Sequence, residues 1–254
     1  RHKTTDLTKQ QIIKICDRKF IGCDQLILIN KNDTSDASLE FYNSDGGTSG
    51  ACGNGTRCVA DLLSKEHNKS LITLTTQSGD LKSEILGDKL VSTEIGKGKI
   101  EWNEIPLSKK LNTNNLNIKI SDLDNNHYTG GTAVNVGNPH VIFFVDNNEN
   151  FEIHKIGPVI EHDSLFPEKC NVTLATIVNK KLIKVKVWER GAGLTKACGT
   201  AACATAFAAM NNGLSSNKVD IEFSTGKLSI FIDENNNIHM KGPVSDIKEI
   251  NIKI

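Results

Sequence analysis

The sequence has no excess of charge of either sign and no long hydrophobic run. Its 254 residues carry 30 Lys and Arg against 30 Asp and Glu, so the formal net charge is zero. Proteins that bind nucleic acid or a membrane surface usually carry a basic patch, and no nucleic-acid partner is expected here. No segment approaches the roughly 18 apolar residues that a membrane span needs. No membrane partner is therefore expected either.

The cysteines lack the pattern of a disulfide framework and that of a zinc site. Seven is an odd number in a chain of this length, which argues against a secreted, disulfide-stabilised domain. No CxxC or HxxxH spacing accompanies them, so no metal is expected. Reduced thiols in a cytoplasmic protein are the better interpretation.

Short β-branched and apolar segments dominate the chain, and only three stretches have helical periodicity. The predicted helices are 8–18, 55–65 and 199–211. The clearest predicted strands are 25–30, 71–76, 141–145, 172–178, 183–188, 219–223 and 228–232.

The two halves of the chain repeat one another when Cys52 is aligned with Cys198, 146 residues later. Each half then contains a strand, a Gly-rich loop, an Ala-Cys-Gly triplet, a helix, a strand, a glycine turn and a strand, in that order. The matched segments are 41–47 with 187–193, 51–53 with 197–199, and, after a shift of one residue, 76–81 with 223–228. A matched series of this length predicts two homologous lobes.

Two lobes related by a pseudo-twofold axis would bring their equivalent cysteines to opposite sides of a cleft. The polar, Asn-rich segment 110–127 looks like the connection between them. We therefore expect an N-terminal lobe over 1–120, completed by the tail 246–254, and a C-terminal lobe over 121–245. The active site would lie in the cleft.

Cys52 and Cys198 each stand where a glycine-containing loop enters a predicted helix. A helix N-terminus carries partial positive charge and free N–H groups, which stabilise a thiolate and can hold a ligand carboxylate. Free cysteines are more often small buried residues, and that interpretation is preferred for Cys16, Cys23, Cys58, Cys170 and Cys203.

A pair of such thiols suits the inversion of a carbon next to a carboxylate. One group removes the Cα proton from one face, and the other returns a proton to the opposite face. The intermediate is enolate-like, and two helix N-termini could stabilise its charge without a metal or pyridoxal phosphate. No cofactor is therefore expected.

With these residues in view, the chain closely resembles the diaminopimelate epimerase family over nearly its whole length. Each matching block is weak alone, but their order and spacing are highly specific. The blocks are 22–25, 43–46, 52–58, 137–140, 166–167, 171–172, 188–193, 197–200 and 242–243.

The resemblance implies a cofactor-independent epimerase with an α+β fold of two pseudo-symmetric lobes, each a barrel-like sheet around a central helix. Its substrate would be a small molecule, LL- or meso-2,6-diaminoheptanedioate, in the synthesis of lysine and peptidoglycan precursors, and the enzyme would be a homodimer. Catalytic roles would fall to Cys52, Cys198, His140 and Glu189. Substrate-binding roles would fall to Gln25, Asn43, Gly53, Asn54, Asn138, Asn171, Glu189, Arg190, Gly199 and Thr200.

The chain departs from the family at its start and near its end. The family begins with a Gly-Asn-Asp-Phe motif, and the duplication places that motif several residues before Arg1, so we expect a short N-terminal segment to be lacking. Lys248 stands where the family often has a tyrosine at its dimer contact, so the dimer is expected from the family only.

Three other activities compete with this interpretation. A proline or hydroxyproline epimerase would use the same paired cysteines, but it binds a compact ring and has no need of Glu189 and Arg190 for a distal head group. A phenazine-type isomerase does not keep both cysteines. A thiol redox sensor, from another class of protein, would need Cys52 and Cys198 to meet as a disulfide.

Overall fold

The structure is a computed structural model that describes residues 7–50, 52–77, 79–87 and 89–251, and the chain forms two compact units. Unit 1 comprises the described residues of Arg1–Glu94 and Gly242–Ile254, and unit 2 comprises Ile95–Lys241. Residues 95–120, which the sequence assigned to the N-terminal lobe, belong to unit 2, because Ile105, Leu107 and Leu116 are buried in its core.

The described part of unit 1 contains helices α1 and α2, strands β1 to β5 and the first part of β6. The strands follow the order β1-β2-β4-β5-β6, and β3 pairs with β2. The elements are α1 (Lys9–Cys16), β1 (Gln25–Asn30), β2 (Ala37–Asn43), β3 (Thr48–Ser49), α2 (Gly53–His67), β4 (Leu71–Thr76), β5 (Gly79–Ile85) and β6 (Leu90–Lys97).

Unit 2 is larger, and its main sheet follows the order β16-β15-β14-β12-β11-β10-β9, with β13 beside β12. A separate hairpin is formed by β7 and β8. The elements are β7 (Ile118–Ser121), β8 (His127–Gly130), β9 (Thr132–Asn135), β10 (Pro139–Phe144), η1 (Asn148–Asn150), α3 (Ile153–Glu161), β11 (Asn171–Asn179), β12 (Leu182–Glu189), β13 (Gly193–Thr195), α4 (Gly199–Asn211), β14 (Lys218–Phe223), β15 (Gly226–Ile232) and β16 (Asn237–Pro243).

The strand registers of the two units repeat as the sequence alignment predicts. In the β2–β3 hairpin Phe41 lies opposite Ser49, and in the β12–β13 hairpin Val187 lies opposite Thr195. The parallel pairs β2–β4 and β12–β14 also correspond, as do the antiparallel pairs β4–β5 and β14–β15. Ala51 and Ser78, which belong to the aligned segments, lie outside the described residues.

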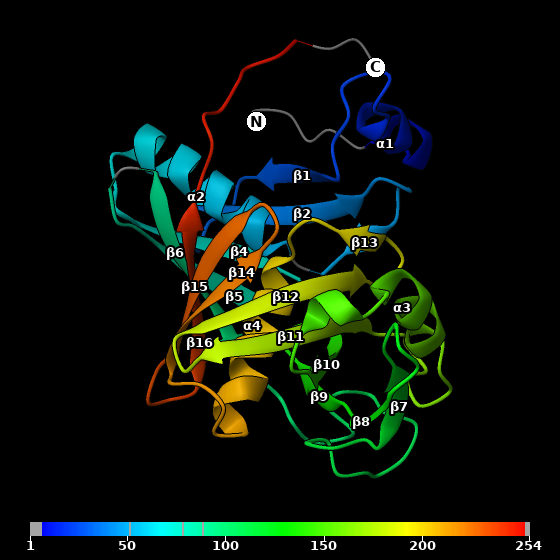
Figure 1. Cartoon of the computed structure of the whole chain (residues 1–254). Coiled ribbons are helices and arrows are strands. Elements are labelled where there is room, and N and C mark those ends of the chain that lie inside the picture. The colour runs from blue at the N-terminus through cyan, green and yellow to red at the C-terminus, as the bar shows by residue number, and fades with distance from the viewer. Residues whose placement is uncertain (1–6, 51, 78, 88, 252–254) are drawn as a thin grey trace. The chain divides into compact units, whose positions relative to one another are not determined.

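The α+β fold is confirmed, and α4 is the central helix of unit 2. Every residue of α4 from Ala201 to Ala209 is buried, and the helix contacts β9, β10, β11, β14 and β15 (Figure 1). A helix that is apolar on all sides is typical of such an enclosed position. Its small alanines allow the surrounding strands to approach closely.

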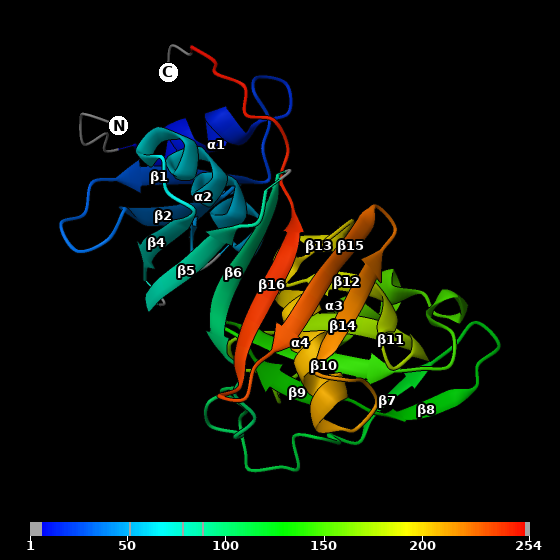
Figure 2. The same ribbon diagram turned by 90° about the vertical axis from the view of Figure 1, so that its left-hand side faces the viewer.

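In unit 1, α2 contacts β4 and β5 (Figure 2). It buries one face, including Val59, Ala60 and Leu63, in a core that Leu39 and Leu74 complete. Among the described residues of both units, no helix is long and apolar enough to span a bilayer.

Candidate active site

Cys52 is the N-cap residue of α2 and has an extended backbone, with φ −144° and ψ 94°. The Gly55 N–H donates to its Sγ at 3.3 Å, so the sulfur lies beside the first turn of the helix. A Cβ at Gly55 would come 2.3 Å from Ile27 Cδ1 and 3.0 Å from this Sγ. The glycine therefore leaves the space that the thiol occupies.

Cys198 is the N-cap residue of α4, with φ −141° and ψ 117°, so its backbone matches that of Cys52. Its side chain is buried, and its Sγ lies 3.4 Å from Thr200 Oγ1. Burial raises the pKa of the Cys198 thiol, and the negative charge of Glu189 raises it further. The sequence predicts that the helix N-terminus stabilises a thiolate here, whereas burial and Glu189 favour the protonated thiol. Cys198 therefore keeps its proton at neutral pH.

His140, Asn138, Asn171 and Arg190 form a connected polar cluster in unit 2. Asn138 Oδ1 lies 2.8 Å from His140 Nε2, and Asn171 donates from Nδ2 to the carbonyl oxygen of Pro139 at 2.9 Å. Asn171 also accepts through Oδ1 from the Arg190 backbone N–H at 3.0 Å. The cluster joins the start of β10, the start of β11 and the end of β12.

His140 is fully buried, and burial lowers its pKa to about 3, with the positive charge of Arg190 as a second cause. The imidazole is therefore neutral at physiological pH. Its 2.8 Å contact with Asn138 Oδ1 fits the tautomer that carries the proton on Nε2. Nδ1 has no hydrogen-bond partner within the described part of the chain.

Glu189 and Arg190 stand at the end of β12, where the chain turns toward β13. Glu189 is half-buried and Arg190 is exposed. The Arg190 side chain donates through Nη1 to the carbonyl oxygen of Glu168 at 2.9 Å. Gly199 is buried and Thr200 is half-buried in the first turn of α4.

The predicted substrate-binding residues of unit 1 lie in two places, on the paired strands β1 and β2 and in the first turn of α2. Gln25 and Asn43 face each other across β1 and β2, and Gln25 Nε2 donates to Asn43 Oδ1 at 3.1 Å. Gly53 is buried in the first turn of α2, and Asn54 is exposed there and accepts from Arg57 Nη2 at 3.0 Å.

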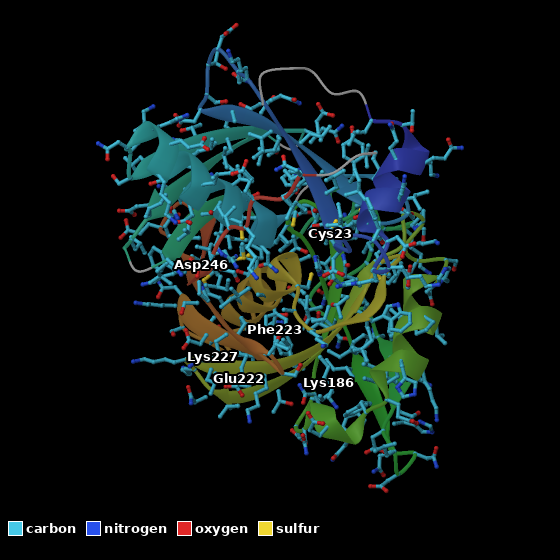
Figure 3. All side chains as sticks on the ribbon, turned by 90° about the horizontal axis from the view of Figure 1, so that it is seen from above. Cys23, Lys186, Glu222, Phe223, Lys227 and Asp246 are labelled. Atoms are coloured by element: carbon cyan, nitrogen blue, oxygen red, sulfur yellow. The ribbon has the colours of Figure 1, made fainter. Side chains whose placement is uncertain are left out.

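The five other cysteines do not all have the expected environment. Cys16, Cys170 and Cys203 are buried, and Cys23 is half-buried with its Sγ 3.4 Å from that of Cys16 (Figure 3 labels Cys23). The expectation of burial is wrong for Cys58, which is exposed. It lies on the outer face of α2, the face opposite the residues that enter the core. Among the described residues, no group of three His, Cys, Asp or Glu side chains could hold a metal ion.

Glu161, at the end of α3, contacts the segment that carries Glu189 and Arg190, and the sequence did not single it out. It is buried, and its carboxylate accepts from Trp188 Nε1 at 2.7 Å and from the Gly191 N–H at 2.9 Å. These two donors flank Glu189 and Arg190. Glu161 belongs to no recognised motif, and only its contacts in the folded chain single it out.

Solved structures of low sequence identity share the fold of this chain. A phenazine biosynthesis protein from Bacillus anthracis matches it with a TM-score of 0.67 at 14% identity, over 98% of this chain and 90% of that one. A probable proline racemase from Agrobacterium radiobacter K84 matches with a TM-score of 0.66 at 11% identity, over 95% of this chain and 81% of that one. At such low identity these likenesses establish the fold alone.

The chain belongs to the diaminopimelate epimerase family. The family model described as diaminopimelate epimerase matches residues 2–101 and 132–247. A diaminopimelate epimerase from Pelagibacter ubique (strain HTCC1062) is 67% identical over 254 residues, which is 100% of this chain and 93% of that protein.

Proposed function

We propose that the protein is a diaminopimelate epimerase that interconverts the LL and meso isomers of 2,6-diaminoheptanedioate by a two-base cysteine mechanism. The observation that carries this proposal is the pair of thiols at Cys52 and Cys198. Each is the N-cap residue of the helix at the same position of a repeated unit, and each is followed by a glycine. The proposal requires both thiols to reach one substrate carbon, from opposite faces, in a cleft between the lobes.

In the forward direction a thiolate removes the Cα proton, and a thiol on the other side donates a proton to the same carbon. The electron pair of the broken C–H bond passes into the adjacent carboxylate as an enolate and returns to Cα when the new C–H bond forms. The raised pKa of Cys198 suits the role of proton donor in the resting enzyme, and Cys52 would then be the base. The roles are exchanged after one turnover, so the reaction runs both ways.

The first backbone N–H groups of α2 and α4, at Gly53-Asn54 and Gly199-Thr200, would bind the reacting carboxylate and stabilise the enolate. Neutral His140 and the Glu189 carboxylate would support the proton transfers near the reacting centre. A neutral imidazole adds no positive charge that would lower the basicity of a nearby thiolate.

The remaining polar residues would bind the distal amino-acid head of the substrate. Arg190 can hold a carboxylate with two hydrogen bonds, and Glu189 can accept from an ammonium group. The amides would fill the other positions of the site, and these are Gln25, Asn43, Asn138 and Asn171. A proline-type substrate has no distal head, so this set of residues favours the linear diamino diacid.

The family resemblance also supports a cytoplasmic enzyme of lysine and peptidoglycan-precursor synthesis that acts as a homodimer. These three points are part of the proposal.

The proposal is tested by incubating the protein with meso-diaminopimelate in D2O and following deuterium at Cα. We expect the wild type to incorporate deuterium and to form the LL isomer, and we expect Cys52→Ser and Cys198→Ser each to lose turnover by about 10²- to 10⁴-fold. No deuterium uptake by the wild type would exclude the epimerase. Unchanged turnover in both variants would exclude the two-thiol mechanism and would favour a redox role for the cysteines.

A further inference from the structure

The strongest unassigned feature is the buried carboxylate of Glu161. Its exposed fraction is 3%, and each of its two oxygens accepts one hydrogen bond. Burying a charged carboxylate is costly unless it is hydrogen-bonded. The two hydrogen bonds supply the partners that a buried carboxyl group needs.

The two donors to Glu161 lie on either side of the functional pair Glu189-Arg190. The indole of Trp188 precedes the pair and the backbone N–H of Gly191 follows it. Gly191 has φ +74°, a left-handed conformation that favours glycine, so the turn has a defined shape that its hydrogen bonds must hold. Bonds to a carboxylate are about twice as strong as neutral ones.

Helix α3 also packs tightly against the same hairpin. A Cβ at Gly157 would come 2.3 Å from Trp188 Cγ, so the glycine allows the indole to lie directly against the helix. Glu161 lies one turn further along α3 and meets the indole N–H. The helix therefore holds the hairpin by contact at Gly157 and by hydrogen bonds at Glu161.

The repeat supplies an internal comparison for this arrangement. The residue 146 positions before Glu161 is Ile15, which is buried in α1, and the residue 146 positions before Trp188 is Tyr42. The Tyr42 hydroxyl donates to Glu40 Oε2 at 2.8 Å, within its own strand. At the aligned position of unit 1 the glutamate is thus replaced by an apolar residue.

We propose that Glu161 is a positioning residue that sets the geometry of Glu189 and Arg190 by clamping the hairpin on both sides of them. This inference rests on the proposed function for its catalytic consequence, and on geometry alone for the clamp. Glu161 does not touch the substrate in this proposal. It acts through the turn whose side chains recognise the substrate.

The clamp is tested with Glu161→Gln, which keeps the shape of the side chain but directs an NH2 group at one of the two N–H donors. We expect hydrogen exchange at the Gly191 amide, measured by NMR, to become at least about tenfold faster. This measurement does not depend on any catalytic activity. Unchanged protection of Gly191 would overturn the clamp.

The catalytic consequence is tested by the kinetics of the same variant. We expect KM for the LL isomer to rise about tenfold, as for the loss of one well-placed charged hydrogen bond, and kcat to fall as well, because the clamp also positions Glu189, which supports the proton transfers. The matched control is Asn148→Ala, which removes a buried amide that donates to the carbonyl oxygens of Leu174 and Lys184 in the same unit. Its KM should stay at the wild-type value although its stability falls.

The possible outcomes separate the two proposals. If KM rises equally in Glu161→Gln and Asn148→Ala, Glu161 has only a structural role and the positioning inference is wrong. If the wild type itself exchanges no deuterium at the substrate Cα, the proposed function fails, whereas the Gly191 exchange result still decides whether the clamp exists.

Discussion

At the scale of the residue, His140 makes the stability of the protein depend on pH. Its folded pKa of about 3 lies well below the value of about 6.5 that an unfolded histidine has. Below pH 6.5 the unfolded chain therefore binds a proton that the folded chain does not. The stability contributed by neutral His140 is fully present above pH 6.5 and is lost as the pH falls toward 3.

We expect the free energy of unfolding of the wild type to fall between pH 7 and pH 5 by about 2 kcal/mol because of this one group. Urea unfolding of the wild type and of His140→Gln at both pH values measures the effect. The variant should be less stable at pH 7 but should lose about 2 kcal/mol less on acidification. An equal loss in both proteins would show that His140 can be protonated in the folded state.

The sequence predicts candidate site residues by type and position but does not predict the environment of their side chains. Cys198 occupies the predicted helix start, yet its pKa is raised because the side chain is buried beside Glu189. Burial and neighbouring charge depend on strands distant in sequence. A local motif predicts where the helix starts, but it does not predict which side chains bury the cysteine there.

At the scale of the element, the predicted bounds of α4 and of β4 are the observed ones. Helix α3 was not predicted. Helix α3 contains Gly157 and Pro158, which are the two residue types least favourable in a helix interior. The proline lies in the second turn, and the helix is stabilised by burial of Ile153 and Ile160. Packing against the hairpin overrides the local propensity, and a local pattern contains no sign of it.

The contact between α3 and Trp188 predicts a strong effect of one added methyl group. We expect Gly157→Ala to lower the free energy of unfolding by about 1–3 kcal/mol, although alanine favours helix, because the new Cβ overlaps the indole. Gly130→Ala is the matched control, because a Cβ there meets open space. It should change stability by no more than about 0.5 kcal/mol.

Urea unfolding of both glycine variants shows whether overlap with the indole or the helix propensity of alanine determines the change in stability. If Gly157→Ala were as stable as the wild type, the indole would be free to move away from α3. The close approach would then contribute nothing to the position of the hairpin.

At the scale of the whole molecule, the repeat explains which features the sequence could predict. The shared registers and the two N-cap cysteines follow from an alignment within one chain. The alignment does not predict which differences between the units matter, such as Glu161 in unit 2 where unit 1 has Ile15. They become visible only when side-chain contacts are known.

The duplicated thiols predict a specific asymmetry between two alanine variants. If Cys52 and Cys198 act on opposite faces of one carbon, each removes the proton of only one isomer. Cys52→Ala should then deprotonate one of the LL and meso isomers and not the other, and Cys198→Ala should show the opposite preference. Each variant should exchange deuterium into its own isomer without inverting it. The remaining thiol removes the Cα proton, exchanges it with D2O and delivers a deuteron to the same face of the carbon.

Deuterium uptake by the LL and meso isomers, measured separately for each variant by mass spectrometry, tests this asymmetry. Inversion should fall by about 10²- to 10⁴-fold in both variants, while exchange survives for one isomer in each. Exchange of the same isomer in both variants would mean that neither thiol is required to remove its proton, which would contradict the assignment of one thiol to each face. Complementary preferences would require one thiol from each unit to act on the same carbon.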